Sequence, residues 1–234
     1  MTNEALLLKV KQRLNKLDSQ DYDNLEPWQV LEAFNKAQLQ WARQKIDGMN
    51  ARQLGDEATK QTIDDLQVLL DEQPVEFGGV VEELYQEVAL PADYLGFKRI
   101  SASAGSSCCP ARPLRIYPCK VANVDAWLHS EHHKPSFSWG ETFYTLQSNR
   151  LQVYTGLEFT IARARLIYYR RPKPVRIVGV LDLTTSLPAL TAQTCELAEA
   201  IAEALVDKTV GILAGDTENS TQYQRAEQTV AVNT

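Results

Sequence analysis

The feature that most constrains the fold is the order in which two kinds of hydrophobic pattern follow one another. Apolar residues recur at helical spacing in the first third of the chain, alternate in short strand-like runs through the middle, and return to helical spacing past Pro188. Helices and strands are thus segregated along the chain, which favours an α+β fold over a parallel βαβ fold. We expect N-terminal helices, a small and mostly antiparallel central sheet, and a long C-terminal helix.

Helical spacing occurs in five segments. Pro27 falls in the first turn of the second segment, where proline is tolerated, and Gly48 provides its C-terminal stop. Leu197, Ile201 and Leu205 mark one face of the last segment, which is rich in alanine. The predicted helices cover residues 3–17, 27–48, 56–73, 121–129 and 191–214.

Short runs rich in β-branched and aromatic residues predict strands in the middle of the chain, the longest being Phe159–Tyr169. The stretch Leu90–Leu95 is expected as a turn. The other predicted strands are Leu84–Val88, Phe97–Ser103, Arg115–Tyr117 and Leu151–Tyr154. We therefore expect a helical region at 1–75, a β-rich region at 76–188, and a helix with a tail at 189–234, together forming one composite unit.

Charge is sorted by position along the chain. Residues 1–97, 98–176 and 177–234 carry net charges of −9, +9 and −6, so the overall −6 hides a basic middle between acidic ends. Opposite blocks attract one another within a chain or between copies, which suits assembly better than small-molecule chemistry. The alternative is that the charges lie interspersed on one folded surface and cancel locally. Both interpretations are open from the sequence.

Composition excludes several classes of protein. A hydrophobic content of 44% and a charged content of 23% are ordinary for a globular protein. No apolar run approaches the roughly 18 residues of a membrane-spanning helix. The N-terminus lacks the pattern of a secretory signal, so we expect folding in a reducing cytosol with Cys195 and the other cysteines as thiols. A pI near 5.2 argues against a dedicated nucleic-acid-binding protein.

Cysteines and histidines between residues 108 and 133 are the main candidates for a metal or catalytic site. Thiolates and imidazoles suit zinc, but two adjacent cysteines cannot easily ligate one tetrahedral ion, and the sequence has no Cys-x-x-Cys pair. A cysteine nucleophile would need a base that the sequence does not position. We therefore expect no enzymatic activity, no metal and no cofactor. The candidate residues are Cys108, Cys109, Cys119, His129, His132 and His133.

The stretch 163–176 interleaves arginines with tyrosines. In an extended strand Arg163, Arg165 and Tyr169 share one face, while Tyr168 lies on the other. Such residues grip phosphates and stack on bases, or they anchor a protein interface. A third reading is a solvated sheet face. The acidic blocks of the same chain offer partners, so we favour the protein interface over nucleic acid.

Five stretches, taken in order, read DYDNLEPWQVLEAFNKAQ from Asp21, LPADYL from Leu90, KPSFSW from Lys134, YYRRP from Tyr168 and GDTENSTQYQR from Gly215. Together they resemble a family of virion structural proteins from short-tailed bacteriophages, including the crAss-like group. These proteins belong to the neck and ring region that joins capsid to tail. The stretches span most of the chain, and none is a catalytic signature.

The resemblance implies a non-enzymatic ring component of the head–tail junction, through whose lumen DNA passes without specific binding. It implies a homo-oligomer, expected as a dodecamer, that contacts the portal and other neck or tail proteins and no membrane. Its expected location is the virion, after assembly in the host cytoplasm. The alternative is a nucleic-acid-binding module using strand 163–176. The expected interface residues are Arg163, Arg165, Tyr168, Tyr169, Arg170, Arg171, Tyr223 and Arg225.

Overall fold

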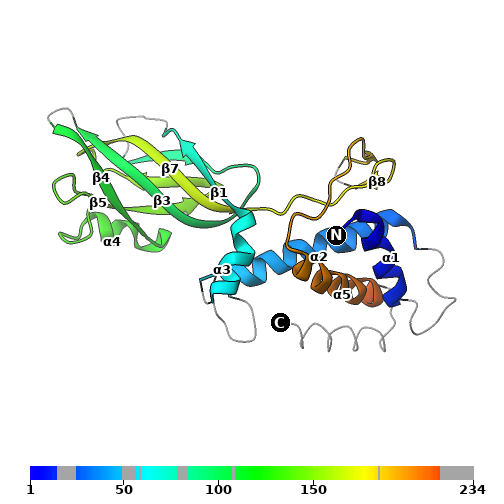
Figure 1. The fold of residues 1–234 in the computed structure, drawn as a ribbon. Coiled ribbons are helices and arrows are strands. Elements are labelled where there is room, and N and C mark those ends of the chain that lie inside the picture. Colours follow the sequence, from blue (N-terminus) through cyan, green and yellow to red (C-terminus); the bar gives the residue numbers. More distant parts are fainter. Residues whose placement is uncertain are drawn as a thin grey trace. The chain divides into compact units, whose positions relative to one another are not determined.

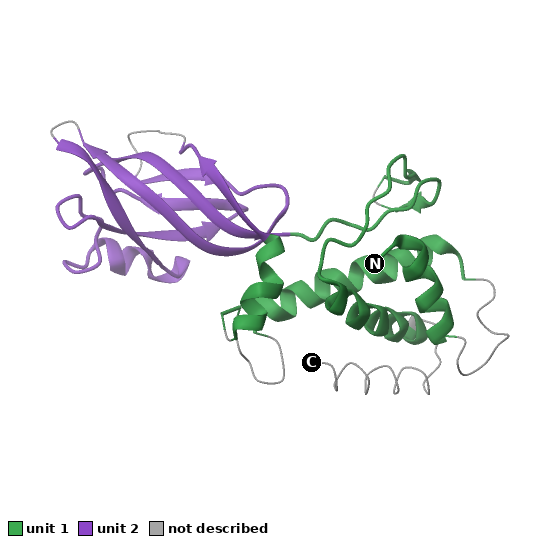
Figure 2. Cartoon of the chain, viewed as in Figure 1, with its two compact units in different colours: residues 1–69, 171–234 green, residues 70–170 purple. Residues whose placement is uncertain are grey.

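The computed structural model describes residues 1–14, 25–48, 56–57, 59–77, 84–106, 109–183 and 185–216. It divides the chain into two compact units, shown in two colours in Figure 2. Residues 1–69 and 171–234 form one, which we call the helical unit, and residues 70–170 form the other, the β unit. The β unit is therefore a continuous insertion between the two halves of the helical unit.

The helical unit contains α1 (Asn3–Leu14), α2 (Pro27–Ile46), α3 (Lys60–Leu66) and α5 (Glu199–Asp216), with a short 3-10 turn, η1, at Gln67–Leu69. Pro27 opens α2 as expected, and the side chain of Gln29 accepts a hydrogen bond from the Glu26 backbone N–H at 3.0 Å. Gly48 follows the end of α2 with φ of +68°, the left-handed conformation that stops a helix at lowest cost in glycine.

Helix α5 packs against α1 and α2, so helices from before and after the inserted β unit share one core (Figure 1). Apolar side chains at helical spacing on each helix point into this core and are almost fully buried. They include Leu6, Val10, Phe34, Ala37, Leu205 and Val206. Because α1 and α2 cannot bury these faces against each other alone, the C-terminal helix completes the unit.

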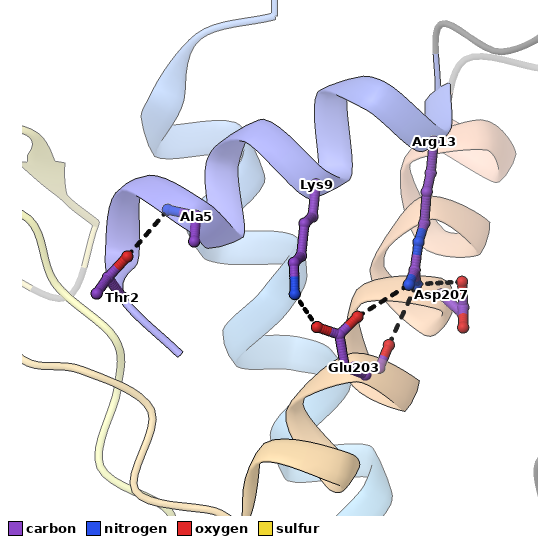
Figure 3. A network of polar contacts seen from close by, with 6 residues as sticks. All are labelled: Thr2, Ala5, Lys9, Arg13, Glu203 and Asp207. Atoms are coloured by element: carbon purple, nitrogen blue, oxygen red, sulfur yellow. Dashed lines mark hydrogen bonds and ion pairs between the residues drawn. The ribbon is translucent and has the colours of Figure 1, made fainter.

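Ion pairs reinforce the packing of α1 on α5 (Figure 3). The carboxylate of Glu203 contacts Lys9 and lies 3.0 Å from the Arg13 guanidinium. Arg13 also pairs with Asp207, one turn further along α5. Lys9 and Arg13 are four residues apart on α1, as Glu203 and Asp207 are on α5, so both pairs lie along one seam.

The β unit is built on a seven-stranded sheet in the order β1-β7-β3-β4-β5-β6-β2. Its strands are β1 (Leu70–Val75), β2 (Tyr85–Ala89), β3 (Tyr94–Ser106), β4 (Cys109–Pro118), β5 (Glu141–Gln147), β6 (Arg150–Tyr154) and β7 (Thr160–Arg170). Neighbouring strands are antiparallel except β4 and β5, which are parallel. The chain must therefore cross over between β4 and β5, and the crossover carries η2 (Val121–Asn123) and α4 (Val124–Leu128).

The sheet curls so that strands from opposite ends of its order meet. The side chain of Gln86 on β2 accepts a hydrogen bond from the Ile161 backbone N–H of β7 at 2.7 Å. Leu166 and Tyr168 of β7 and Leu151 and Val153 of β6 belong to one buried cluster inside the curl. The sheet thus wraps its own core, as in a partly closed barrel.

The α+β class and the C-terminal helix are confirmed, but the expectation of a small sheet is wrong. Two strands account for the difference. The predicted third helix does not reach Pro74, because the chain becomes strand β1 at Leu70. Pro74 is tolerated there since β1 is an edge strand, where a missing N–H costs little. The segment Glu141–Gln147, for which we expected no strand, forms β5 in the sheet interior.

The last helix begins at Glu199, eight residues later than the predicted start at Thr191. Residues 191–198 are irregular instead, and Gln193 among them forms an isolated β-bridge with Arg176. The Asn3 side chain donates to both backbone carbonyls of this bridge, at 2.9 Å to Arg176 and 3.3 Å to Gln193. Side-chain bonding to the backbone therefore displaces the helix at this point.

Candidate protein-interaction surfaces

Much of the charge that is sorted along the sequence is neutralised inside the β unit. Residues 70–97 carry seven acidic and no basic residues, yet β1 and β2 pair with the arginine-bearing strands β7 and β6. Glu72 lies 3.2 Å from Arg165, and Glu87 pairs with Arg150. The whole unit holds ten basic and eleven acidic residues. Local cancellation, the alternative left open by the sequence, therefore describes much of this surface.

The charges of two arginines on the outward face of β3 and β7 are not neutralised in this way. Arg163 on β7 is opposite Ser103, and Arg99 on β3 is opposite Ile167; both side chains are exposed. Within the described part of the chain neither makes an ion pair, whereas Arg165 between them is held by Glu72. Since neither guanidinium has an acidic partner there, this face can take up anionic groups of a partner. We call Arg99 and Arg163 the arginine face.

The two tyrosines of the predicted interface belong to the interior of the unit. Tyr168 is fully buried and its hydroxyl donates to Asp93 at 3.0 Å; burial and this acceptor raise the pKa of the phenol. Tyr169 is only 5% exposed, and the Lys98 ammonium lies 5.8 Å from its ring centre. Neither ring is available to stack on a base or a partner, which corrects the sequence assignment. Since neighbouring residues of a strand point to opposite faces, the burial of both tyrosines means that the end of β7 is covered on both faces.

The remaining predicted interface residues are more scattered. Arg170, at the end of β7, is half-buried, and Arg171, the first residue after the insertion, is exposed. Tyr223 and Arg225 lie outside the described residues. Strand β7 therefore presents only Arg163 and Arg165 of the predicted set as exposed side chains.

An apolar arm projects from the helical unit at residues 177–190 (Figure 1). It contains the two-residue strands β8 (Leu181–Asp182) and β9 (Leu187–Pro188), paired antiparallel. Leu187 is 65% exposed and Leu190 is 92% exposed. The other exposed apolar side chains of the arm are Val178, Leu181 and Leu183. Five large apolar residues left in water on one short segment are typical of a surface that a partner covers.

The base of the arm is anchored rather than loose. Asn35 of α2 accepts a hydrogen bond from the Val175 backbone N–H at 2.8 Å and donates to its carbonyl at 3.2 Å. Arg176 lies 2.7 Å from the Asp182 carboxylate as an ion pair, although its Nε does not meet hydrogen-bond geometry. A cavity of about 200 Å³ lies between α2 and this base, with Trp28 in its wall. The arm therefore presents its leucines from a fixed root.

A larger cavity lies in the β unit beneath the crossover that joins the parallel strands β4 and β5. Its volume is about 780 Å³. Trp139 in its wall is 67% exposed and Tyr117 is 45% exposed. Three carboxylates and one lysine also line it, namely Glu131, Glu141, Glu158 and Lys134. We call it the crossover cavity.

The cavity wall is held in place by stacked rings and backbone contacts. Trp127 of α4 stacks on His133 with ring centres 4.8 Å apart and meets Phe143 edge-on at 5.3 Å. Glu158 accepts a hydrogen bond from the Phe137 backbone N–H at 3.2 Å. Tyr117 donates to Glu141 at 3.4 Å. These contacts fix both aromatic and acidic groups around an open space.

The cysteine and histidine candidates do not gather into a metal site or a catalytic pair in the described residues. No three metal-binding side chains come together there, and Cys108 itself lies outside the described part. His129 is hydrogen-bonded through Nδ1 to the Asp125 carbonyl at 2.7 Å, which is a local helix-end contact. Burial raises the pKa of the Cys119 thiol, opposite to the shift that activates a nucleophile.

Sequence reasoning missed both the arm and the cavity. The leucine-rich run between Ile177 and Leu190 could have indicated the arm, since apolar residues between turn residues must be covered by a core or by a partner. The cavity had no such signal, because it depends on the parallel pairing of β4 with β5. Only the location of Trp139 in a polar stretch hinted at an exposed aromatic side chain.

No family model and no curated protein matches this chain. Among the helices of the described residues, none has the length and apolar character needed to cross a bilayer.

Proposed function

We propose that this chain is a non-enzymatic virion structural protein that forms an oligomeric ring at the head–tail junction of a short-tailed bacteriophage. The observation that carries the assembly part is the apolar arm of the helical unit, where Leu187 is 65% exposed and Leu190 is 92% exposed. The virion part rests on the resemblance of the five sequence stretches. DNA would pass through the lumen of such a ring without specific binding.

In the proposed ring each copy contacts the next through repeated heterologous contacts, which close when the rotation between copies allows. The arm is suited to this role because its root is fixed by Asn35 while its leucines remain uncovered. Burying exposed leucines contributes roughly 1.5–3 kcal/mol for each side chain that becomes fully covered. The next copy in the ring is the partner we assign to the arm, and the portal is a further expected partner.

The test is the mass of the purified protein in solution, measured by light scattering after size-exclusion chromatography, alone and mixed with the portal protein of the same phage. We expect a discrete multimer, proposed as a dodecamer, in at least one of the two samples. A single copy in both samples at every concentration would contradict the proposal.

The arm is tested by the double variant Leu187→Ser with Leu190→Ser. We expect it to weaken assembly about 10-fold or more, since two apolar contacts are lost, while its circular dichroism spectrum stays that of the wild type. Leu8→Ser, at a side chain 69% exposed on α1, is the matched control. Equal loss in the control and the arm variant would show that general apolar exposure, and not the arm, governs assembly.

A nucleic-acid-binding module is the second candidate, and the arginine face favours it. Arg99 and Arg163 can contact phosphates, although the burial of Tyr168 and Tyr169 removes base stacking from this proposal. Purified protein should then bind duplex DNA with a steep salt dependence that flattens in the Arg99→Gln, Arg163→Gln variant. Binding that is absent at low salt would exclude this candidate.

A further inference from the structure

We infer that the crossover cavity of one copy receives an arginine of the arginine face of the next copy, so that the β units of neighbouring subunits join by insertion of a guanidinium between aromatic rings and carboxylates. This inference rests on the proposed ring and names one of its contacts. The partner is a second copy of this chain, because the donor and the acceptor groups are both on the same unit, where the arginines have no ion pair in the described residues and the carboxylates are only partly engaged.

The cavity has the two kinds of group that a guanidinium requires. Aromatic faces attract its planar cation, and carboxylates accept its forked N–H donors. Trp139 and Tyr117 supply exposed aromatic rings, and Glu131 and Glu158 supply exposed carboxylates. Lys134 offsets part of this negative charge, so the cavity lining retains a net acidic character of three carboxylates against one lysine.

The carboxylates of the cavity are only partly engaged within one copy. Glu158 accepts one backbone hydrogen bond at 3.2 Å, which leaves further acceptor positions on its two oxygens. Glu141 lies 3.7 Å from Arg115, a long contact to a side chain that is 78% exposed. Glu131 is exposed, and no hydrogen bond or ion pair of its side chain occurs in the described part of the chain.

The arginine face supplies the complementary charge. Arg99 and Arg163 extend from a rigid sheet, so little backbone entropy is lost when they insert into a partner. Arg165 is excluded from this role because Glu72 already holds it at 3.2 Å. Arginine is among the residues that most often dominate protein interfaces, and a contact sheltered from water strengthens its ion pair.

Because the cavity and the arginine face are different patches of one unit, the contact is heterologous and repeats from copy to copy. This property permits a decisive experiment with two complementary variants. The cavity variant is Trp139→Ala with Glu158→Arg, and the arginine variant is Arg99→Glu with Arg163→Glu. Lys36→Glu, an exposed lysine of α2 with no ion pair in the described residues, is the matched charge control.

We expect each complementary variant alone to self-associate about 30-fold more weakly than the wild type, under the conditions in which the wild type assembles. The Lys36→Glu control should assemble normally. An equimolar mixture of the two variants should regain association as pairs, since each pair contains one intact cavity contact. Because both variants keep the arm, larger particles should form no more readily than in either variant alone. Masses are read by light scattering, and circular dichroism verifies that each variant is folded.

The outcomes separate the inference from the proposed function. If the wild type and both variants assemble alike, the ring stands and the cavity contact is wrong. If the variants fail alone and the mixture also stays monomeric, the two patches do not meet each other, and the inference is overturned. If the wild type never assembles, the proposed function fails and the inference falls with it.

Discussion

The two units of this protein complete their cores by different means. The helical unit takes α1 and α2 from one end of the chain and α5 from the other, and joins them through an apolar core with an ion-paired seam. The β unit is one continuous segment whose sheet curls, with Gln86 linking β2 to β7. Their exposed features also differ: the helical unit presents the leucines of its arm, whereas the β unit presents the arginine face and the aromatic side chains of the crossover cavity. Each unit thus offers a different chemistry to a partner.

The largest expected effect comes from removing a buried side chain in one unit at a time. Phe34→Ala in the helical unit should destabilise that unit by about 3–5 kcal/mol, and Leu166→Ala in the β unit by about 2–5 kcal/mol. Both side chains are fully buried. Hydrogen exchange measured by mass spectrometry should show the loss of protection confined to the substituted unit. An equal loss of hydrogen-exchange protection in both units after either substitution would mean that the chain unfolds in one cooperative step.

The closure of the sheet can be weakened by a smaller change. Gln86→Ala removes the acceptor of the Ile161 N–H and should cost the β unit about 1 kcal/mol in free energy of unfolding, because a partly buried donor loses its protein acceptor. Gln147→Ala, at an exposed residue at the end of β5, is the control and should change stability by less than about 0.5 kcal/mol. Urea denaturation measures both. If both variants lose a similarly small amount of unfolding free energy, the curl of the sheet does not depend on this hydrogen bond.

The smallest expected effect is at the ion-paired seam. Hydrogen bonding and charge from Lys9, with Arg13 adding to them, hold the pKa of Glu203 below its usual value, even though partial burial opposes this. The folded state therefore favours the carboxylate, so the stabilisation is present above the ordinary pKa and is lost as the pH falls through the lowered one. Glu203→Gln should cost no more than about 1 kcal/mol at neutral pH, since the seam is partly exposed.

The measurement is the difference in unfolding free energy between wild type and Glu203→Gln at neutral and acidic pH. It should shrink toward zero as the pH is lowered, and it should also shrink in high salt. Glu32→Gln, at an exposed residue of α2, should show no such dependence. A difference that is constant with pH would contradict the assigned origin of the shift.

The sequence was a better guide to helices and long strands than to the surfaces. The 3.6 periodicity located α1 and α2 because their apolar faces and end residues, such as Pro27 and Gly48, act locally. Strands β1 and β5 were not predicted, because each depends on its pairing with a neighbouring strand. Strand β1 pairs with β7, and β5 pairs in parallel with β4. Local patterns do not contain that information.

The candidate site shows the same limit. The arginines of residues 163–176 were recognisable as a charged run, but the pairing of Arg165 depends on Glu72 of the neighbouring strand β1, which lies 3.2 Å from it. The burial of Tyr168 depends on the curl of the sheet, and the crossover cavity on strand order. Long-range pairing therefore decided which predicted residues remain available.

The insertion of the β unit between the halves of the helical unit also sets an order of events during synthesis. Helices α1 and α2 leave the ribosome long before α5, the partner that buries their apolar faces, exists. The β unit, being continuous, can fold in this interval, since domains form as units while the chain grows. A nascent chain that stops short of residue 199 would therefore carry a folded β unit together with α1 and α2, whose apolar faces lack their cover, and such faces are a natural target for chaperones.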